Sequence, residues 1–325
     1  MASERPPGPP VAAEPSSTLE LVVGAALTRE GEPLPGRGPV AEGIPGRERA
    51  DTIRRVIVYL VLAAVSLLFF VPFFWSISTS LKTLPETVGF DLLPADPSFR
   101  AYREAITTFN FGRYFLNSLF LASVVTAFNL FLASLGGYAF ARLRFPGREA
   151  LFFLVLGTLM IPHELRLVPV FQMLAEFPVT GWNLLGTYQG YFLINLVGAT
   201  NLFLMRQYFL TIPKDYEEAA KLDGAGYFKT FWRVMLPLAG PALAAITILT
   251  FQGTWNDFFW PLVIFLGDET KYTLPLGINQ FRSQYSTQWP ELMAASVLAI
   301  IPIFALYVFF QRYFIAGITS AGVKG

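Results

Sequence analysis

Long runs of apolar residues alternate with short polar segments along most of the chain. A helix needs about 20 apolar residues to cross the roughly 30 Å hydrocarbon core of a bilayer. The pattern therefore predicts six membrane-spanning helices, at about residues 56–75, 114–140, 147–162, 181–205, 234–263 and 292–311. The third run is the shortest, and its ends are the least defined.

Residues 1–50 differ from the rest, with nine of the 24 prolines and no aromatic side chain. This composition buries too little apolar surface to offset the entropy of ordering. The apolar patch at 19–27 is too short to span a bilayer and lacks the pattern of a signal peptide. We expect a disordered cytoplasmic tail before a membrane domain at 51–325; the alternative is that translation starts further along.

Composition places the chain among integral membrane proteins of the all-α class. Hydrophobic residues make up 54% and charged residues 14%, whereas a soluble domain carries about 25% charged residues. The net charge of +1 gives no indication of a nucleic-acid partner. The chain has no cysteine and a single histidine, His163, which excludes thiolate and multi-histidine metal sites. We expect no metal to be bound.

The distribution of Lys and Arg predicts the orientation. With the N-terminus and the C-terminus in the cytoplasm, 17 of the 24 Lys and Arg residues lie inside, as the positive-inside rule favours. The clearest cluster is Arg142, Arg144 and Arg148. Two further segments, 99–109 and 165–177, carry apolar residues at helical spacing and are expected to lie along the outer membrane surface.

A polar segment at 206–235 separates the fourth and fifth runs. Pro213 suits a helix start, and Asp215, Glu217 and Glu218 favour the positive end of the helix dipole. A turn is expected at 224–226, because glycine tolerates positive φ. A second short helix at 227–235 then leads into the next span. The predicted element is a helix–turn–helix that contacts a partner in the cytoplasm.

Several polar residues fall at membrane depth, where they are costly and often functional. Amides and carboxylates beside an aromatic platform suit sugar hydroxyls, so five residues are candidates for the substrate pathway: Asn195, Gln252, Trp255, Asn256 and Asp257. The alternative is that Asn256 and Asp257 cap or cross-link helices. His163, Glu164 and Arg166 follow Pro162; we expect them in the outer headgroup layer, and the alternative is a proton relay.

The segment Glu218-Ala219-Ala220, followed by Gly224, Val234, Leu236 and Pro237, resembles the signature loop of membrane subunits of ATP-binding-cassette (ABC) importers. Val234 stands where Ile is commoner. The resemblance extends over about residues 55–325 to the smaller six-helix subunit of maltose-type sugar permeases. It is carried by Gly137-Tyr138-Ala139-Phe140-Ala141-Arg142, Trp255-Asn256-Asp257-Phe258, Tyr272-Thr273-Leu274-Pro275 and the C-terminal Gly317–Gly325. The proline-rich tail departs from the family pattern.

This resemblance implies a type I ABC importer permease in a bacterial or archaeal cytoplasmic (inner) membrane, moving a sugar inward by alternating access. Its partners would be a second permease subunit, two ATPase subunits and an extracytoplasmic solute-binding protein. ATP and Mg²⁺ would bind to the ATPase subunits, and no cofactor to this chain. Glu218, Ala219, Ala220, Gly224, Val234, Leu236 and Pro237 would form the ATPase-coupling element.

In this family the last outer loop contacts the binding protein, which makes Gln280, Arg282 and Gln284 candidates for that contact; the alternative is an ordinary solvated loop. The sequence lacks a Gly-Lys-Ser/Thr phosphate loop, so we do not expect the chain to be an enzyme that hydrolyses ATP. Glycerol phosphate or a polyamine is an alternative cargo. A self-sufficient secondary transporter is an alternative class, which would require inverted repeats.

Overall fold

The structure, a computed structural model, describes residues 45–89, 91–108, 110–282 and 287–322. Its regular elements there are helical, apart from an isolated antiparallel bridge between Arg282 and Thr287, which confirms the all-α prediction. The α-helices are α2 (Pro45–Ser80), α3 (Arg100–Thr108), α4 (Phe111–Arg142), α5 (Arg148–Gly157), α6 (Leu167–Ala175), α7 (Tyr188–Asn195), α8 (Ala199–Thr211), α9 (Asp215–Leu222), α10 (Tyr227–Thr230), α11 (Leu236–Leu238), α12 (Gly240–Trp255), α13 (Phe259–Ile264), α14 (Leu274–Asn279) and α15 (Trp289–Gly322).

Short 3₁₀ turns lie between several of these helices, at Pro85–Val88, Thr158–Met160, His163–Arg166 and Glu269–Lys271. A π-helical turn covers Phe231–Met235. The chain divides into two units, residues 1–69 and 70–325. Most of the first unit lies outside the described residues, including 1–44 of the predicted tail, and the rest of that tail, from Pro45, belongs to α2. The described part of the first unit is the N-terminal stretch of α2, whose apolar side chains are exposed, as suits a helix that meets lipid or another subunit.

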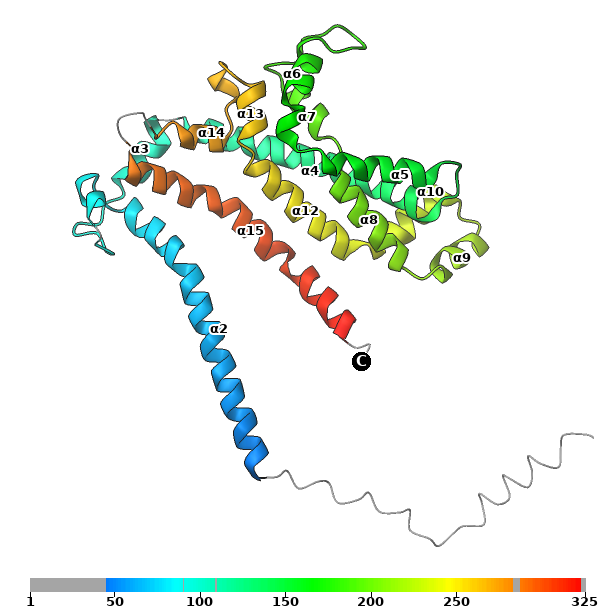
Figure 1. Cartoon of the computed structure of the whole chain (residues 1–325), viewed down its shortest axis with the longest axis horizontal. Helices are drawn as coiled ribbons and strands as arrows, with labels where there is room; N and C mark the ends of the chain where they lie inside the picture. The colour runs from blue at the N-terminus through cyan, green and yellow to red at the C-terminus, as the bar shows by residue number, and fades with distance from the viewer. Residues whose placement is uncertain (1–44, 90, 109, 283–286, 323–325) are drawn as a thin grey trace, which may run out of the picture. The chain divides into compact units, whose positions relative to one another are not determined.

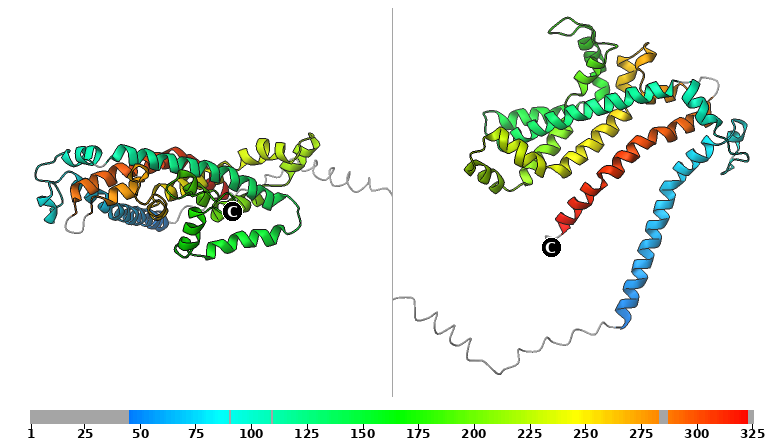
Figure 2. Two further views of the ribbon diagram at one scale, coloured as in Figure 1. Left: turned by 90° about the horizontal axis from the view of Figure 1, so that it is seen from above. Right: turned by 180° about the vertical axis from the view of Figure 1, so that it is seen from behind.

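Helix α4 is the central element of the second unit. Helices α8 and α12 pack along it, and α15 packs on α12 (Figures 1 and 2). Two groups of buried aromatic residues lie toward opposite ends of α4. One surrounds Tyr138, with Phe209 and Phe231, and the other surrounds Tyr114, with Phe251 and Trp255. Because each group joins α4 to α12 or to the turn before it, the helices are clamped at both ends.

A glycine allows the closest approach of α4 to α8. A Cβ atom on Gly137 would lie 2.5 Å from the Cβ of Met205 and 2.9 Å from the backbone nitrogen of Arg206. Real side chains do not tolerate such distances, so only glycine lets the two backbones meet here. The packing of α8 on α4 therefore depends on this residue.

Two predicted spans are not single helices. The 181–205 run begins without helix as far as Thr187 and then breaks between α7 and α8, at residues 196–198. The 234–263 run divides into α11, α12 and α13, and the axis bends by 76° between Leu238 and Gly240. The prediction of one uninterrupted helix over each run is wrong, because an apolar run reports contact with lipid or core and not the continuity of backbone hydrogen bonds.

Three of the described helices are long and apolar enough to cross a membrane, or up to five if each bent pair is one span. One bent pair is formed by residues 148–160 and 164–175, at 98°. The total of six spans stays a prediction. Helices α3 and α6 match the two segments expected to lie along the outer membrane surface, and that location also stays a prediction.

We predict that Gly137→Ala destabilises the folded subunit, because the added methyl group forces α4 and α8 apart. Overpacking of this kind costs about 1–3 kcal/mol. Gly112→Ala, in the first turn of the same helix, is the matched control, since a Cβ there meets nothing within 4 Å. Thermal unfolding of the purified subunit checks the expectation. Equal melting temperatures for the two variants would contradict it.

Candidate coupling and translocation site

Helix α9 carries the first part of the predicted coupling element. The carbonyl of Lys214 accepts hydrogen bonds from the backbone N–H groups of Glu217 and Glu218, at 2.9 and 3.0 Å. Asp215, Glu217 and Glu218 occupy its first turn. Their charges oppose the positive end of the helix dipole, which stabilises a helix of only eight residues.

Gly224 ends α9 in a left-handed conformation, with φ of +74°. The N–H of Ala225 donates to the carbonyl of Ala220 at 2.9 Å, and the N–H of Gly224 donates to that of Lys221 at 3.0 Å. This hydrogen-bond pair defines a Schellman cap, which needs a residue at positive φ. Gly224 therefore sets the direction in which the chain leaves α9, as the sequence predicted for this turn.

The far face of α9 is open to solvent. Glu218 and Ala219 are exposed, and Leu222 is 90% exposed. Phe228, at the start of the second short helix, is also exposed. Apolar side chains held at a polar tip in this way are typical of a docking surface. Sequence reasoning missed Leu222 and Phe228 as surface residues, because apolar residues in a membrane protein are first assigned to lipid contact or packing.

The base of the element is buried. Phe231 and Met235 lie in the aromatic group around Tyr138, within the π-helical turn where the N–H of Leu236 donates to the carbonyl of Phe231. Val234 and Leu236 are half-buried, and Pro237 is exposed. The second predicted helix thus forms as α10 followed by a π-helical turn. It anchors the coupling element to the bundle.

An ion pair joins α4 to α9. Arg142 Nε lies 3.7 Å from Glu217 Oε2, and the two side chains are 5% and 12% exposed. The Arg142 guanidinium also donates to the backbone carbonyls of Phe209, at 2.6 Å, and Ile212. Arg142 therefore contacts the end of α8 and the inner face of α9 at once. The sequence indicated Arg142 only as a cytoplasmic charge, and this pairing was missed.

A cavity of about 860 Å³ lies beside the break between α7 and α8. Its wall comes from α4, α5, both sides of the break and α12. The polar members of the lining are mainly amides and hydroxyls: Asn129, Thr158, Arg166, Asn195, Thr200, Asn201, Thr250 and Thr254. Among the lining residues that the structure describes, Arg166 is the one ionisable side chain and there is no carboxylate. The sequence placed Arg166 in the outer headgroup layer.

Asn129 organises the polar side of this cavity. Its side-chain oxygen accepts from the Gly198 N–H at 2.7 Å and from the Asn201 amide at 2.9 Å. Its own amide donates to the carbonyl of Asn195 at 2.8 Å. One side chain on α4 thus satisfies backbone groups that the helix break leaves without helical partners. Asn129 is itself an amide inside the second predicted span, 114–140. That position could have identified it as a candidate, but the sequence prediction did not include it.

The predicted pathway residues separate into two sets. Asn195 lines the cavity. Gln252 and Asn256 are exposed outside its lining. The prediction that Trp255 lines the pathway is wrong. Its side chain is 1% exposed, and its indole N–H donates to the carbonyl of Ala299 at 3.1 Å, so it serves packing. Asp257 accepts from the Tyr191 hydroxyl at 2.8 Å and from the Trp260 N–H at 3.2 Å.

Asp257 therefore takes the cross-linking and capping role that was left open as its alternative. The side chain of His163 lies outside the described residues. In the predicted outer loop, Arg282 is exposed, and Gln280 accepts a 3.4 Å hydrogen bond from Tyr114. Gln284 lies outside the described residues. Hydrogen bonds from Lys271 and Thr270 lower the pKa of Asp268 to about 2, because they stabilise its carboxylate form.

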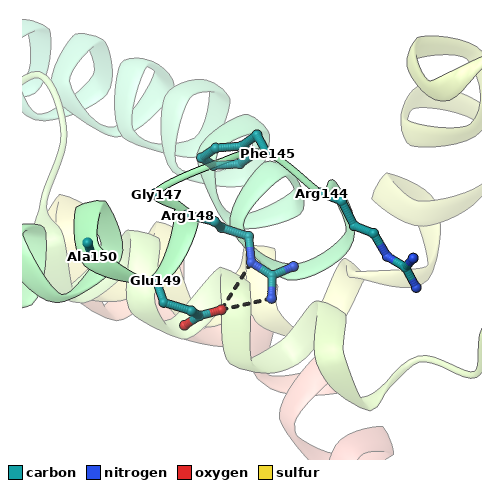
Figure 3. A pocket seen from close by; sticks show the side chains of 6 residues that line it. All are labelled: Arg144, Phe145, Gly147, Arg148, Glu149 and Ala150. Carbon is teal, nitrogen blue, oxygen red and sulfur yellow. Dashed lines mark hydrogen bonds and ion pairs between the residues drawn. The ribbon is translucent and has the colours of Figure 1, made fainter.

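The corner between α4 and α5 forms a second, smaller hollow of about 490 Å³ (Figure 3). Arg148 and Glu149 face each other across it, with 2.8 Å between Nη2 and the carboxylate. Glu149 also binds Arg206 of α8 at 2.9 Å. Arg144 points away from this pair in the same view. Of the basic cluster, Arg148 thus pairs within α5, while the contact between Glu149 and Arg206 joins α5 to α8.

The sequence of residues 133–320 matches the family described as the binding-protein-dependent transport system inner membrane component. This match covers more than half of the chain and includes the coupling element and all of the cavity lining except Val125 and Asn129. The protein therefore belongs to that family: it is an inner-membrane permease subunit of an ABC importer, whose ATPase is a separate subunit.

Relatives of known function agree with this assignment. The chain is 36% identical over 279 residues to the arabinooligosaccharides transport system permease protein AraQ of Bacillus subtilis, covering 84% of this chain and 97% of that protein. It is 37% identical over 213 residues to the sn-glycerol-3-phosphate transport system permease protein UgpE of Yersinia enterocolitica, covering 65% and 74%. The resemblance stated from the signature loop is confirmed.

A solved structure has the same fold. A chain of a bacterial ABC transporter involved in the import of the acidic polysaccharide alginate matches with a TM-score of 0.71 and 27% identity, covering 82% of this chain and 98% of that one. A chain of the alginate transporter in complex with a pentasaccharide-bound periplasmic protein matches at 0.58 and 16% identity, which supports the fold alone. An all-helical permease of the importer type is therefore established.

We predict that Asn129→Leu lowers the stability of the subunit by about 2 kcal/mol, because it leaves the partly buried Gly198 N–H and the buried Asn201 amide without their acceptor. Asn256→Leu is the control, since it removes an amide of the same size from an exposed position. Thermal unfolding of the two purified variants measures the difference. A melting temperature for Asn129→Leu equal to that of the control would refute the organising role of this side chain.

Proposed function

We propose that this permease subunit takes up an oligosaccharide and is driven through α9, with Glu218 to Gly224 as the contact with an ATPase subunit. The exposed, capped helix on a buried base is the observation that carries this proposal. Glu218, Ala219 and Leu222 face solvent, while Phe231 and Met235 hold the segment in the core. A docking element needs both an open tip and a rigid base to transmit force.

The proposed orientation is supported by contacts at the same end of the molecule. Arg142 contacts Glu217, so the basic cluster and α9 lie on one side of the membrane. The positive-inside rule places that side in the cytoplasm, where ATPase subunits reside. Both termini are accordingly proposed to be cytoplasmic. A second permease subunit, a pair of ATPase subunits and a solute-binding protein complete the proposed complex, and Gln280 and Arg282 are candidates for contact with the last of these.

The cavity beside the α7–α8 break is the proposed part of the substrate pathway in this chain. Its volume of about 860 Å³ lies within the range of small-molecule sites. Asn195, Thr250 and Thr254 offer neutral donors and acceptors, which suit sugar hydroxyl groups. We retain Asn195 from the predicted pathway set, and the exposed Gln252 and Asn256 as candidates further along the path.

Two observations bear on the cargo. The absence of a carboxylate among the lining residues disfavours a polyamine, whose cationic amines need anionic partners. Arg166 in the lining and the similarity to a glycerol-3-phosphate permease keep a phosphorylated cargo as the second candidate. The oligosaccharide is preferred because the other polar lining groups are neutral. Ligand screening of the co-purified binding protein against arabino-oligosaccharides and glycerol 3-phosphate separates the two.

We predict that Glu218→Lys and Gly224→Val abolish ATP-driven uptake by complexes that still assemble. Glu218→Lys reverses the charge at the proposed contact, and Gly224→Val cannot adopt positive φ without strain. Uptake into vesicles and co-purification of the ATPase subunits provide the measurements. Gly226→Val is the control, because Gly226 has a negative φ, of −73°, and a Cβ there meets nothing within 4 Å. Unchanged uptake in both Glu218→Lys and Gly224→Val would contradict the proposed coupling role.

The cavity generates a separate prediction. Gly253 lines it, and a Cβ there meets nothing within 4 Å, so Gly253→Ile projects a side chain into the space without displacing a neighbour. We expect uptake to fall by about tenfold or more, since a blocked site excludes the ligand. Gly157→Ile is matched in residue type and free space but lies outside the cavity lining. Equal uptake by the two variants would remove the cavity from the pathway.

A further inference from the structure

The inner face of α9 carries a single charged group. Of the eight residues of this helix, all are exposed except Glu217, which is partly buried, and Ala220, which is buried. The two are three residues apart and therefore share one face. Ala220 supplies only a methyl group. Any specific polar contact between α4 and this face of α9 must therefore involve Glu217.

Arg142 is the partner that meets this face. Its guanidinium is almost fully buried and donates to the two carbonyls at the C-terminal end of α8. A planar guanidinium has a fixed fork of donors, so its orientation is set once two acceptors are bound. Nε then points to Glu217 at 3.7 Å. Arg142 thus belongs to the last turn of α4 while it binds α8 and faces α9.

This contact differs from the rest of the cluster in one respect. Arg142 Nε is buried and has no hydrogen-bond partner in the described structure, because 3.7 Å is too long for a hydrogen bond. The buried N–H therefore keeps a free donor directed at Glu217. A small approach of α9 to α4 would convert the ion pair into a charge-assisted hydrogen bond.

We propose that Arg142 and Glu217 are positioning residues that transmit the motion of α9 sideways into α4, in addition to the route along the chain into α12. The proposal rests on the function proposed above. The chain leads from α9 through α10 and the π-helical turn into α11 and α12, so α12 moves with α9 by connection alone. Helix α4 precedes α9 by more than 70 residues in sequence and has no such connection. Its link to α9 is by side chains.

The two routes lead to different walls of the same cavity. Leu159 follows α5, which is joined to the end of α4 by residues 143–147, and Gly253 is on α12. Both residues line the cavity and are exposed. The chain has no cysteine, so a single cysteine introduced at either position is its only thiol. Motion on each route can therefore be followed separately within the assembled complex.

The experiment uses the full complex with four variants of this subunit. Leu159→Cys and Gly253→Cys are each made once with the native Glu217 and once with Glu217→Gln. A maleimide–polyethylene glycol reagent labels this chain, with and without a non-hydrolysable ATP analogue, and the mass shift of the chain gives the rate. We expect ATP to change both rates when Glu217 is present. With Glu217→Gln, the response at Leu159→Cys should fall by about fivefold or more, while the response at Gly253→Cys persists.

Asp215→Asn is the matched control, because it neutralises a carboxylate in the same helical turn that faces solvent. It should leave both responses intact. Arg142→Lys keeps the positive charge but loses the planar array of N–H donors of the guanidinium. We therefore expect an intermediate response at Leu159→Cys. Equal responses at the two cysteines in the Glu217→Gln complex, whether both retained or both lost, overturn the inference. No response to ATP with Glu217 present overturns the proposed function itself, and the inference with it.

Discussion

The close approach of α4 and α8 at Gly137 is the contact on which the rest of the second unit depends. The two backbones come so near at Gly137 that a Cβ there would lie 2.5 Å from the Cβ of Met205, and α4 side chains on either side of this point reach the two ends of α8. Five residues further along α4, Arg142 binds the carbonyls at the C-terminal end of α8. Eight residues before Gly137, Asn129 accepts a hydrogen bond from the N–H of Gly198, at the N-terminal end of α8. A wider separation would break both sets of hydrogen bonds.

The break between α7 and α8 illustrates how polar backbone is tolerated within an apolar segment. Unpaired N–H and carbonyl groups are costly away from water, and Asn129 supplies partners on both sides of the break. The same break opens the polar cavity. Broken helices are common in secondary transporters, but this chain belongs to an importer family with a separate ATPase. Such breaks therefore indicate a polar site in a membrane and not the energy source.

The sequence predicted the all-helical class, the importer family and the coupling segment, because each depends on local patterns. Gly224 illustrates this: a residue at positive φ after a short helix is recognisable from its neighbours alone. The contacts that hold the site together are nonlocal and were missed. Arg142 and Glu217 are 75 positions apart, and no periodicity of α4 or α9 relates them.

Trp255 illustrates a different error, in which a pathway role was predicted for a residue that is buried in the packing. An aromatic ring beside amides has the composition of a sugar platform, yet helix α15 covers it and accepts its N–H. The helical face on which a residue lies depends on neighbours that an apolar run does not specify. For the same reason the continuity of the 181–205 and 234–263 segments was mispredicted.

Helix α4 connects the proposed coupling contact to the proposed substrate cavity. Arg142 and Asn129 are 13 residues apart on one continuous helix, a rise of about 20 Å at 1.5 Å per residue. Arg142 faces the coupling helix, and Asn129 lies in the wall of the cavity. A helix with unbroken hydrogen bonds bends little over this length, so a displacement at one end reaches the other without an intermediate element. By contrast, the route through α12 passes a π-helical turn and a 76° bend, where part of any displacement can be absorbed. The straighter path is the one that depends on a buried ion pair.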